Sequence, residues 1–335
     1  NFVKSKIKWN GNYGKFAQYG VRKAYMDKSG NDADINLLVT SMLRSVGVDA
    51  NPVLISTRDN GIPLFPTRKG FNYVICSVRK DNNYLFIDAT DQYGTGNILP
   101  FRVLNWQGRL IEENGVSSWV DVMPKNKSTE TTFLNAKINE DFSITGKVAK
   151  NFTSYSAYGY RAKYNNMSEE DHIKSLEDEK GDIEISELNV ENKDEISEAV
   201  KLSYEYELLD GADEIGDKVY FTPMLFFATK ENPFKLDERI YPIDYVLPFK
   251  DSFIVNVMIP EGYVVESLPD AGAMEFKGSQ VKFLYFVKAN GSYLQLRIDL
   301  EVNNPIILPA DYKDYKDFYS KIIEKQTEQV VLSKA

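Results

Sequence analysis

The chain has 335 residues, of which 43% are hydrophobic and 27% are charged, and its formal net charge is −9. This length predicts two or three domains. The acidic balance argues against a nucleic-acid-binding protein, because such proteins carry basic patches that neutralise phosphates. A single cysteine, Cys76, and a single histidine, His172, exclude an internal disulfide and a zinc site built from several such residues. We therefore expect neither a metal nor a cofactor.

The chain contains no window of 18 or more apolar residues, so the sequence predicts no membrane-spanning helix. No signal peptide stands at its start. The opening residues NFVKSKIKW instead look like the inside of a structural element. We expect that the chain is a fragment whose true N-terminus has been removed.

Residues 1–118 are predicted to form a mixed α/β domain. A first helix is expected over 16–30, with a glycine at its end, since glycine accepts the left-handed conformation that often closes a helix. A second, buried helix is expected over 33–46, where apolar residues recur at helical spacing, and either Asn31 or Asp32 can cap it. Three strands follow, at 51–57, 71–79 and 84–90, with a turn at 80–83.

Residues 119–335 are predicted to form a second, all-β domain of the sandwich type. From about Val120, many short segments alternate apolar and polar residues, and the turns between them are rich in Asn, Asp, Gly and Pro. Helical inserts are expected at 154–166 and 168–181, and a last helix near 310–326. The whole chain is therefore predicted to have an α+β fold.

Several segments together resemble a known family. GNDADINLLVTSMLRSVGVDANPVLISTRDNG (30–61), FNYVICSV (71–78) and YLFIDATDQYGTGNILP (84–100) are similar to a transglutaminase-like domain, in the form found in envelope proteins of Bacteroidota. ENPFKLDERIYPIDY (231–245) and YKDFYSKIIEKQTEQVVLSK (315–334) are similar to the C-terminal domain of unknown function that accompanies it. The resemblance implies a papain-like fold for the first domain, a further domain upstream of this chain, and a place in the periplasm or cell envelope.

The resemblance also implies a catalytic triad, which this sequence keeps only in part. In the family, a cysteine at the start of a buried helix attacks an amide carbonyl, a histidine on the next strand transfers the proton, and an aspartate on the neighbouring strand orients the histidine. The family's Gly-x-Cys motif matches 30–32, which places Asp32 at the nucleophile position. Tyr73 stands at the histidine position, and Asp88 is kept as the orienting acid.

Neither Cys76 nor His172 is expected to replace the missing groups. Cys76 lies three residues after Tyr73 on one predicted strand, so the two side chains point to opposite faces. The apolar neighbours of Cys76 predict that it is a small buried hydrophobic residue. His172 lies in the second domain, in the charged segment EEDHIKSLEDE, and is predicted to be solvated at the surface.

Two roles are open for Asp32. It could act with Asp88 as a pair of catalytic carboxylates, of the kind that hydrolyse glycosides, but the sequence holds no second signal for sugar chemistry. A carboxylate at a helix N-terminus also accepts backbone N–H groups and offsets the helix dipole. We therefore expect Asp32 to cap the helix, and Tyr73 to donate a hydrogen bond to Asp88.

The sequence favours a catalytically inactive, transglutaminase-like protein of the bacterial cell envelope that acts in protein or peptide binding or in assembly. The alternative is a hydrolase of the peptidase or amidase type with an altered site that uses Asp32 and Asp88. A third hypothesis is that the chain binds a peptide in the cleft where the family holds extended peptides, since loss of the catalytic residues need not remove that cleft. The identity of a protein or peptide partner is not readable from the sequence.

Overall fold

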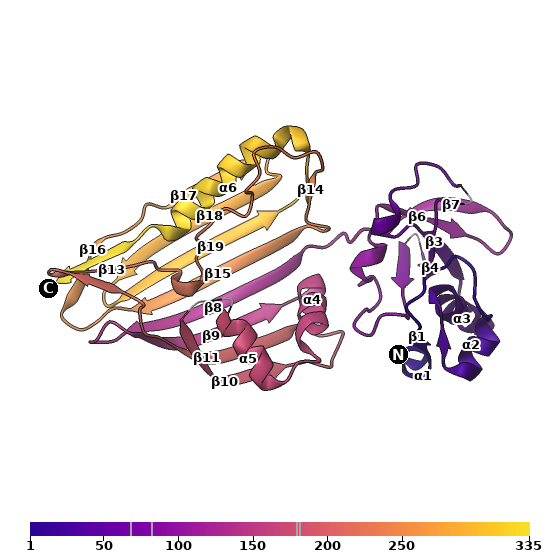
Figure 1. Ribbon diagram of the computed structural model, residues 1–335, viewed down its shortest axis with the longest axis horizontal. Coiled ribbons are helices and arrows are strands. Elements are labelled where there is room, and N and C mark those ends of the chain that lie inside the picture. Colours follow the sequence, from indigo (N-terminus) through magenta and orange to yellow (C-terminus); the bar gives the residue numbers. More distant parts are fainter. Residues whose placement is uncertain (68, 82, 179, 181) are drawn as a thin grey trace. The chain divides into compact units, whose positions relative to one another are not determined.

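The computed structural model describes residues 1–67, 69–81, 83–178, 180 and 182–335, which form two compact units, Asn1–Lys125 and Asn126–Ala335 (Figure 1). Each unit is described by itself. The border lies later than the predicted border after residue 118, because strand β7 (Ser117–Asp121) pairs with β6 (Gln107–Ile111) in the sheet of the first unit. The predicted turn at 80–83 and the insert at 168–181 include positions 82, 179 and 181, which lie outside the described residues.

The first unit is a five-stranded antiparallel sheet with helices packed on it. The strand order is β5-β4-β3-β6-β7. Its helices are α1 (Phe2–Lys6), α2 (Val21–Asp27) and α3 (Asp32–Ser45), with 3₁₀ turns at Arg58–Asn60 and Phe101–Val103. The remaining strands are β1 (Lys8–Trp9), β2 (Ser29–Gly30), β3 (Ala50–Ile55), β4 (Tyr73–Lys80) and β5 (Asn83–Ile87).

Helix α3 is the buried helix that the apolar period predicts, and it packs on strands β3 and β4. The prediction of a helix over 16–30 is mostly wrong, because α2 occupies only Val21–Asp27. Lys28, with φ of 56°, closes α2 in the left-handed conformation, and Gly30 belongs to strand β2. Strand β2 pairs with β1, so the residues just before α3 are extended rather than helical.

The second unit is built on one eight-stranded sheet, with the order β10-β11-β9-β8-β15-β19-β18-β17. All neighbours in this sheet are antiparallel except the parallel pair β8 and β15. Its strands are β8 (Ser128–Ile138), β9 (Ile144–Phe152), β10 (Ile183–Glu191), β11 (Val200–Leu208), β15 (Phe249–Met258), β17 (Gly272–Phe276), β18 (Val281–Asn290) and β19 (Tyr293–Val302).

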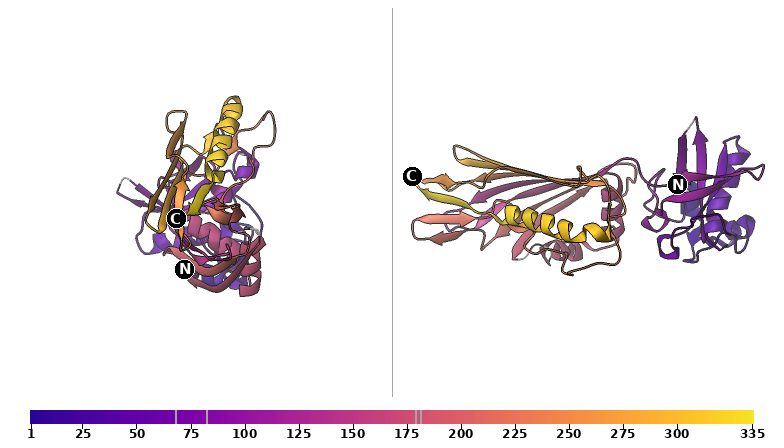
Figure 2. Two further views of the ribbon diagram at one scale, coloured as in Figure 1. Left: turned by 90° about the vertical axis from the view of Figure 1, so that its left-hand side faces the viewer. Right: turned by 90° about the horizontal axis from the view of Figure 1, so that it is seen from above.

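A second layer covers one face of this sheet. It consists of three helices and a four-stranded sheet of order β12-β13-β21-β16, and Figure 2 shows α6 lying along the large sheet. The members of this layer are α4 (Ser154–Tyr164), α5 (Glu169–Asp178), α6 (Tyr312–Thr327), β12 (Asp213–Ile215), β13 (Lys218–Phe221), β16 (Tyr263–Ser267) and β21 (Val330–Lys334). A short pair, β14 (Ile243–Asp244) with β20 (Ile306–Ile307), and 3₁₀ turns at Leu225–Phe227 and Pro309–Asp311 complete the unit.

The core of the second unit lies between these two layers, where alternate residues of the large sheet meet the helices and the smaller sheet. The α+β class predicted from the sequence is confirmed, and the layer opposite the large sheet is a mixture of helices and strands. The helices at 154–166, 168–181 and 310–326 correspond to α4, α5 and α6. Among the described residues, no helix combines the length and the apolar character needed to cross a bilayer.

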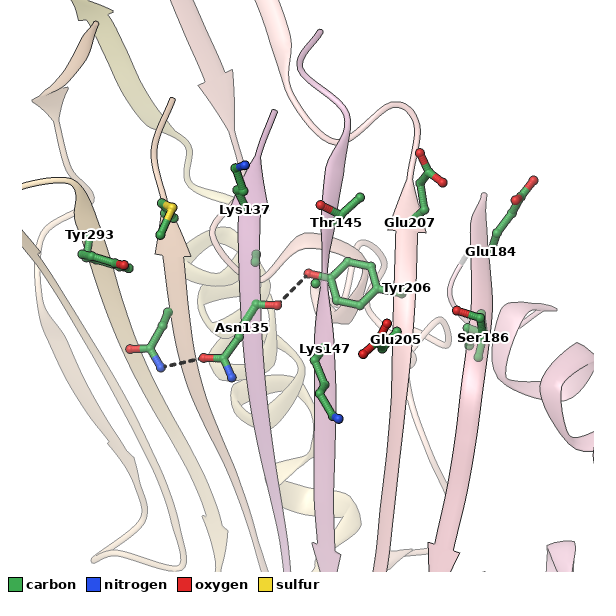
Figure 3. Close-up of a pocket in the computed structure, with 15 residues that line it drawn as sticks. Asn135, Lys137, Thr145, Lys147, Glu184, Ser186, Glu205, Tyr206, Glu207 and Tyr293 are labelled. Carbon is green, nitrogen blue, oxygen red and sulfur yellow. Dashed lines mark hydrogen bonds between the residues drawn. The ribbon is translucent and has the colours of Figure 1, made fainter. Parts of the chain in front are cut away.

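The large sheet also carries an open depression of about 720 Å³ (Figure 3). Asn135, Lys147 and Glu205 stand directly opposite one another on β8, β9 and β11. The amide of Asn256 donates to the side-chain oxygen of Asn135 at 3.1 Å. These polar groups thus face one another across neighbouring strands, and none of the residues predicted for the catalytic site lies here.

Candidate functional site

Asp32 lies at the N-terminus of α3, where the family resemblance places a nucleophile. One carboxylate oxygen accepts the backbone N–H of Gly14 at 2.6 Å, and the other accepts the backbone N–H of Val74 at 2.7 Å. Asp32 thus ties the start of α3 to strand β4 and to the loop after β1. Each oxygen thus accepts one backbone N–H, and because the side chain is fully buried, neither oxygen is open to a substrate.

The prediction that Asp32 caps α3 is wrong. The cap is Asn31, whose side-chain oxygen accepts the N–H of Asp34 at 2.8 Å, while the Asp34 carboxylate accepts the N–H of Asn31 at 3.1 Å. This reciprocal pair is a capping box. Asp34 also accepts the N–H groups of Tyr19 and Gly20, at 3.2 and 2.9 Å. Asp34 therefore holds the segment before α2 against the start of α3.

Tyr73 and Asp88 form the hydrogen bond expected from the sequence. The Tyr73 hydroxyl donates to Oδ2 of Asp88 at 2.8 Å. The other oxygen of Asp88 accepts the side-chain amide of Asn36 at 3.0 Å and both the N–H and the hydroxyl of Thr90, at 2.9 and 2.7 Å. Asp88 is thus surrounded by donors, and its two oxygens are already engaged.

Arg102 joins this network from the segment after strand β5, and the sequence analysis did not identify it. Its guanidinium donates to the Tyr73 hydroxyl at 3.0 Å and to the Thr90 hydroxyl at 2.7 Å. It also lies 3.7 Å from the Asp88 carboxylate and 3.8 Å from that of Asp91. The positive charge of Arg102 therefore offsets the negative charge of the buried Asp88. No sequence motif indicates this role of Arg102.

Aromatic rings close the site. The ring of Tyr13 meets the ring of Tyr73 edge-on, with centroids 5.4 Å apart, and Trp9 stacks on Tyr13 at 5.6 Å with an interplanar angle of 7°. The guanidinium of Arg102 lies 4.6 Å from the centre of the Trp9 ring, a cation–π contact. The segment from Trp9 to Gly14 therefore packs directly on the replaced triad.

Solvent does not reach these groups. Asp32 and Tyr73 are 0% exposed, and Asp88 is 2% exposed. Burial raises the pKa of Asp32 to about 7, although the backbone donors Val74 and Gly14 act in the opposite direction. Burial, together with the charge of Asp88, also raises the pKa of Tyr73 well above its usual value. Tyr73 is thus a protonated hydrogen-bond donor at neutral pH and a poor substitute for a histidine base.

Cys76 lies in the middle of β4 with no exposed surface. It is an odd number of residues from Tyr73, so the two side chains occupy opposite faces of the strand, as the sequence analysis expected. Burial raises the pKa of the Cys76 thiol. A buried, protonated thiol is not a nucleophile.

His172 differs from its prediction as a surface residue. It is only 6% exposed, and its ring stacks on Tyr164 with centroids 4.3 Å apart. The Tyr160 hydroxyl lies 3.5 Å from Nε2 of His172. Four residues later, Leu176 is also buried, so His172 belongs to the apolar stripe of α5. Burial lowers the pKa of His172, and the ring has a packing role in the second unit.

The described residues contain no group of three or more His, Cys, Asp or Glu side chains arranged to hold a metal ion. At the triad position, the first unit thus presents a closed polar network in which Tyr73, Thr90 and Arg102 surround Asp88, while Asp32 is held separately by two backbone N–H groups. Paired donors and acceptors of this kind are the arrangement of a structural network.

Comparisons with known proteins agree with this fold. A family model described as a domain of unknown function with a solved structure, DUF3858, matches residues 217–332, which lie in the second unit. A crystal structure of a "putative protease" from Parabacteroides distasonis ATCC 8503 is similar over 99% of this chain, with a TM-score of 0.51 and 10% sequence identity. The chain spans 50% of that protein, and at this identity the likeness concerns the fold alone. No curated protein matches the chain.

Proposed function

We propose that the first unit is a catalytically inactive transglutaminase-like scaffold and that the protein acts in the bacterial cell envelope by binding a protein or peptide. The observation that carries this proposal is the closed state of the triad position. Asp32, Tyr73 and Asp88 have almost no exposed surface, and their polar atoms are paired within the unit. An enzyme needs its reacting group within reach of substrate.

The alternative, a peptidase or amidase that uses Asp32 and Asp88, needs a carboxylate free to attack or to move a proton. Asp88 accepts from Tyr73, Asn36 and Thr90, so its oxygens already have partners. Asp32 is held by two backbone donors. These contacts favour the inactive scaffold over the altered hydrolase.

A binding role is supported by the surface of residues 16–26, which follow the segment that closes the site. Phe16 and Met26 are 68% and 70% exposed, and Tyr19 is about half exposed. Tyr19 and Met26 line a depression of about 550 Å³ beside α2 (Val21–Asp27). Large exposed apolar side chains that gather at one place are characteristic of an interaction surface. We propose this surface, named here the α2 surface, as the place where the partner binds.

Selection of peptides from a displayed library against the full chain tests this role. Peptides that bind the α2 surface should lose roughly tenfold or more in affinity with Met26→Glu, since a carboxylate would then replace the apolar contact. Met167→Glu is the matched control, because Met167 is also exposed but lies in the second unit. Failure to enrich any peptide, or equal affinities for the two variants, would remove the support for this surface.

A further inference from the structure

The α2 surface lies in a part of the chain whose charge is opposite to that of the whole. Residues 1–28 contain seven lysines and arginines and a single acid, Asp27, whereas the whole chain has a net charge of −9. Over the complete units, Asn1–Lys125 has 16 basic and 11 acidic residues, and Asn126–Ala335 has 24 and 38. The negative charge of the protein therefore belongs to the second unit, and the first unit is basic.

Four cations of residues 1–28 are exposed and have no ion pair among the described residues. They are Lys6, Lys8, Arg22 and Lys28. The one acid of this segment, Asp27, pairs with Lys23 at 2.5 Å and therefore offsets the charge of that lysine alone. Lys4 and Lys15 do not belong to the set, since each donates to a backbone carbonyl of another segment. Four exposed positive charges without partners attract a negatively charged molecule.

Arg22 brings one of these charges to the depression beside α2. It lines the depression together with Tyr19 and Met26. Arg22 and Met26 are four residues apart on α2, so their side chains are neighbours on one face of the helix. Lys28 ends α2, and its backbone carbonyl accepts the N–H of Lys8 at 3.0 Å, which places these two lysines side by side. The α2 surface thus offers an apolar contact and positive charge next to each other.

The rim of the depression is held in place by the core of the first unit. The N–H groups of Tyr19 and Gly20 donate to the carboxylate of Asp34, at 3.2 and 2.9 Å. Asp34 is fully buried and also completes the capping box of α3. The side-chain amide of Gln18 donates to the Tyr19 hydroxyl at 3.3 Å. A surface that is fixed in this way loses little conformational entropy when a partner binds.

We propose that the partner of the α2 surface is an acidic peptide segment with one large apolar or aromatic side chain, an inference that rests on the proposed function. The apolar side chain enters the depression, whose volume of about 550 Å³ accommodates an aromatic ring, and contacts Tyr19 and Met26. The acidic residues around it pair with Arg22, Lys28 and Lys8.

A lipid surface fits the α2 surface less well than a peptide does. Helix α2 has only seven residues, and its exposed positions mix charged side chains with Tyr25 and Met26. It therefore has no continuous apolar face to bury in a bilayer. The depression is also concave, which suits a single side chain that projects from a peptide.

Fluorescence anisotropy with three labelled peptides tests this proposal on the full chain. Each peptide has a central tryptophan, flanked by aspartate and glutamate in the first, by asparagine and glutamine in the second and by lysine in the third. We expect the acidic peptide to bind at least about tenfold more tightly than the amide peptide, and the lysine peptide to bind more weakly still. Raising the salt concentration from about 0.05 to about 0.5 M should reduce this preference, because salt screens exposed charges.

Variants separate the charge from the apolar contact. Arg22→Gln combined with Lys28→Gln should weaken the acidic peptide roughly threefold to tenfold and leave the amide peptide unchanged. Lys137→Gln combined with Lys147→Gln is the matched control, since it removes the same charge from two exposed lysines of the second unit that also have no ion pair among the described residues. Met26→Ser should weaken both peptides alike. All these positions are exposed, so the variants should fold, and circular dichroism checks this.

The acidic partner is overturned if the amide peptide binds as tightly as the acidic one, or if the two double variants have equal effects. When Met26→Ser still weakens both peptides, the α2 surface remains the binding site and the proposed function stands. Absence of binding by all three peptides also overturns the acidic partner, and only an empty library selection in addition removes the proposed function. Tighter binding of single-stranded DNA or of phosphatidylglycerol vesicles than of the acidic peptide would overturn it in favour of nucleic acid or lipid.

Discussion

The hydroxyl of Tyr73 donates a 2.8 Å hydrogen bond to Oδ2 of Asp88, in the place where the family resemblance would have a histidine paired with its orienting acid. The polar side-chain contact between the two neighbouring segments is thus present, but burial raises the pKa of the phenol, so Tyr73 stays protonated at neutral pH and cannot take up a proton as a histidine base does. The Tyr73–Asp88 hydrogen bond therefore has the position of a catalytic contact, but its role is to stabilise the fold of the first unit.

Replacing Tyr73 by phenylalanine should destabilise the first unit by about 1–3 kcal/mol, because Asp88 and Arg102 would each lose a buried hydrogen bond. Urea unfolding followed by tryptophan fluorescence measures this change. The signal reports the first unit, since all three tryptophans, at 9, 106 and 119, lie within Asn1–Lys125.

Tyr84→Phe is the control for this variant. The Tyr84 hydroxyl accepts an exposed hydrogen bond from Arg79 at 3.0 Å, and its loss should change the stability by no more than about 0.5 kcal/mol. Equal effects of the two variants would show that the Tyr73–Asp88 contact adds nothing to the stability.

Asn31→Ala should cost about 0.5–2 kcal/mol of stability, since it removes the cap of α3. Asp34→Ala should cost more, because the Asp34 carboxylate accepts from Asn31, Tyr19 and Gly20. The same fluorescence measurement gives both values. The reverse order would contradict the assignment of Asp34 as the residue that holds the segment before α2.

The stability of the first unit should fall as the pH rises from about 4 to about 7. Burial raises the pKa of Asp32 from 3.8 to about 7, so the folded state binds more protons than the unfolded state in this window. The contribution of Asp32 is fully present below about pH 4 and is lost as the pH passes through 7. Asp32→Asn cannot titrate and should flatten the slope, by at most about 1.4 kcal/mol per pH unit.

Unfolding at pH 4.5, 5.5 and 6.5 measures this slope for the wild type and for Asp32→Asn. The variant should also lose some stability at every pH, because an amide can accept only one of the hydrogen bonds from Gly14 and Val74. Asp251, whose pKa burial also raises to about 7, lies in the second unit and is unchanged in both proteins. Identical slopes would contradict the raised pKa of Asp32.

Cys76 should react with a thiol reagent only when the first unit unfolds. Its side chain has no exposed surface and its pKa is raised by burial. The rate of reaction with a chromogenic disulfide in native buffer should therefore be far below the rate in urea. Fast labelling of the native protein would show that the thiol is accessible.

Helix α3 and the strands around it follow from local patterns, because a buried helix and a buried strand each leave a clear apolar period. The cap was harder to assign, since Asn31 and Asp32 are both good capping residues. The deciding signal was Asp34, three residues after Asn31, which completes the capping box.

Other features depend on tertiary contacts that no local pattern contains. The short α2 reflects the hydrogen bonds of Tyr19 and Gly20 to Asp34. Arg102 reaches the site from a separate segment, so only the folded chain brings it to Asp88. The burial of His172 could have been inferred from its spacing to Leu176, but the charged residues around it outweighed that signal.

The rate of amide turnover tests the central claim most directly. Peptide hydrolysis, deamidation and transamidation by the wild type, Asp88→Ala and Asp32→Asn can be measured side by side with a buffer blank. Cys76→Ala serves as the control for any contribution of the buried thiol. A closed, hydrogen-bonded network predicts the blank rate for all four proteins. A wild-type rate above the blank that Asp88→Ala or Asp32→Asn abolishes, with both variants still folded, would show that the site is catalytic.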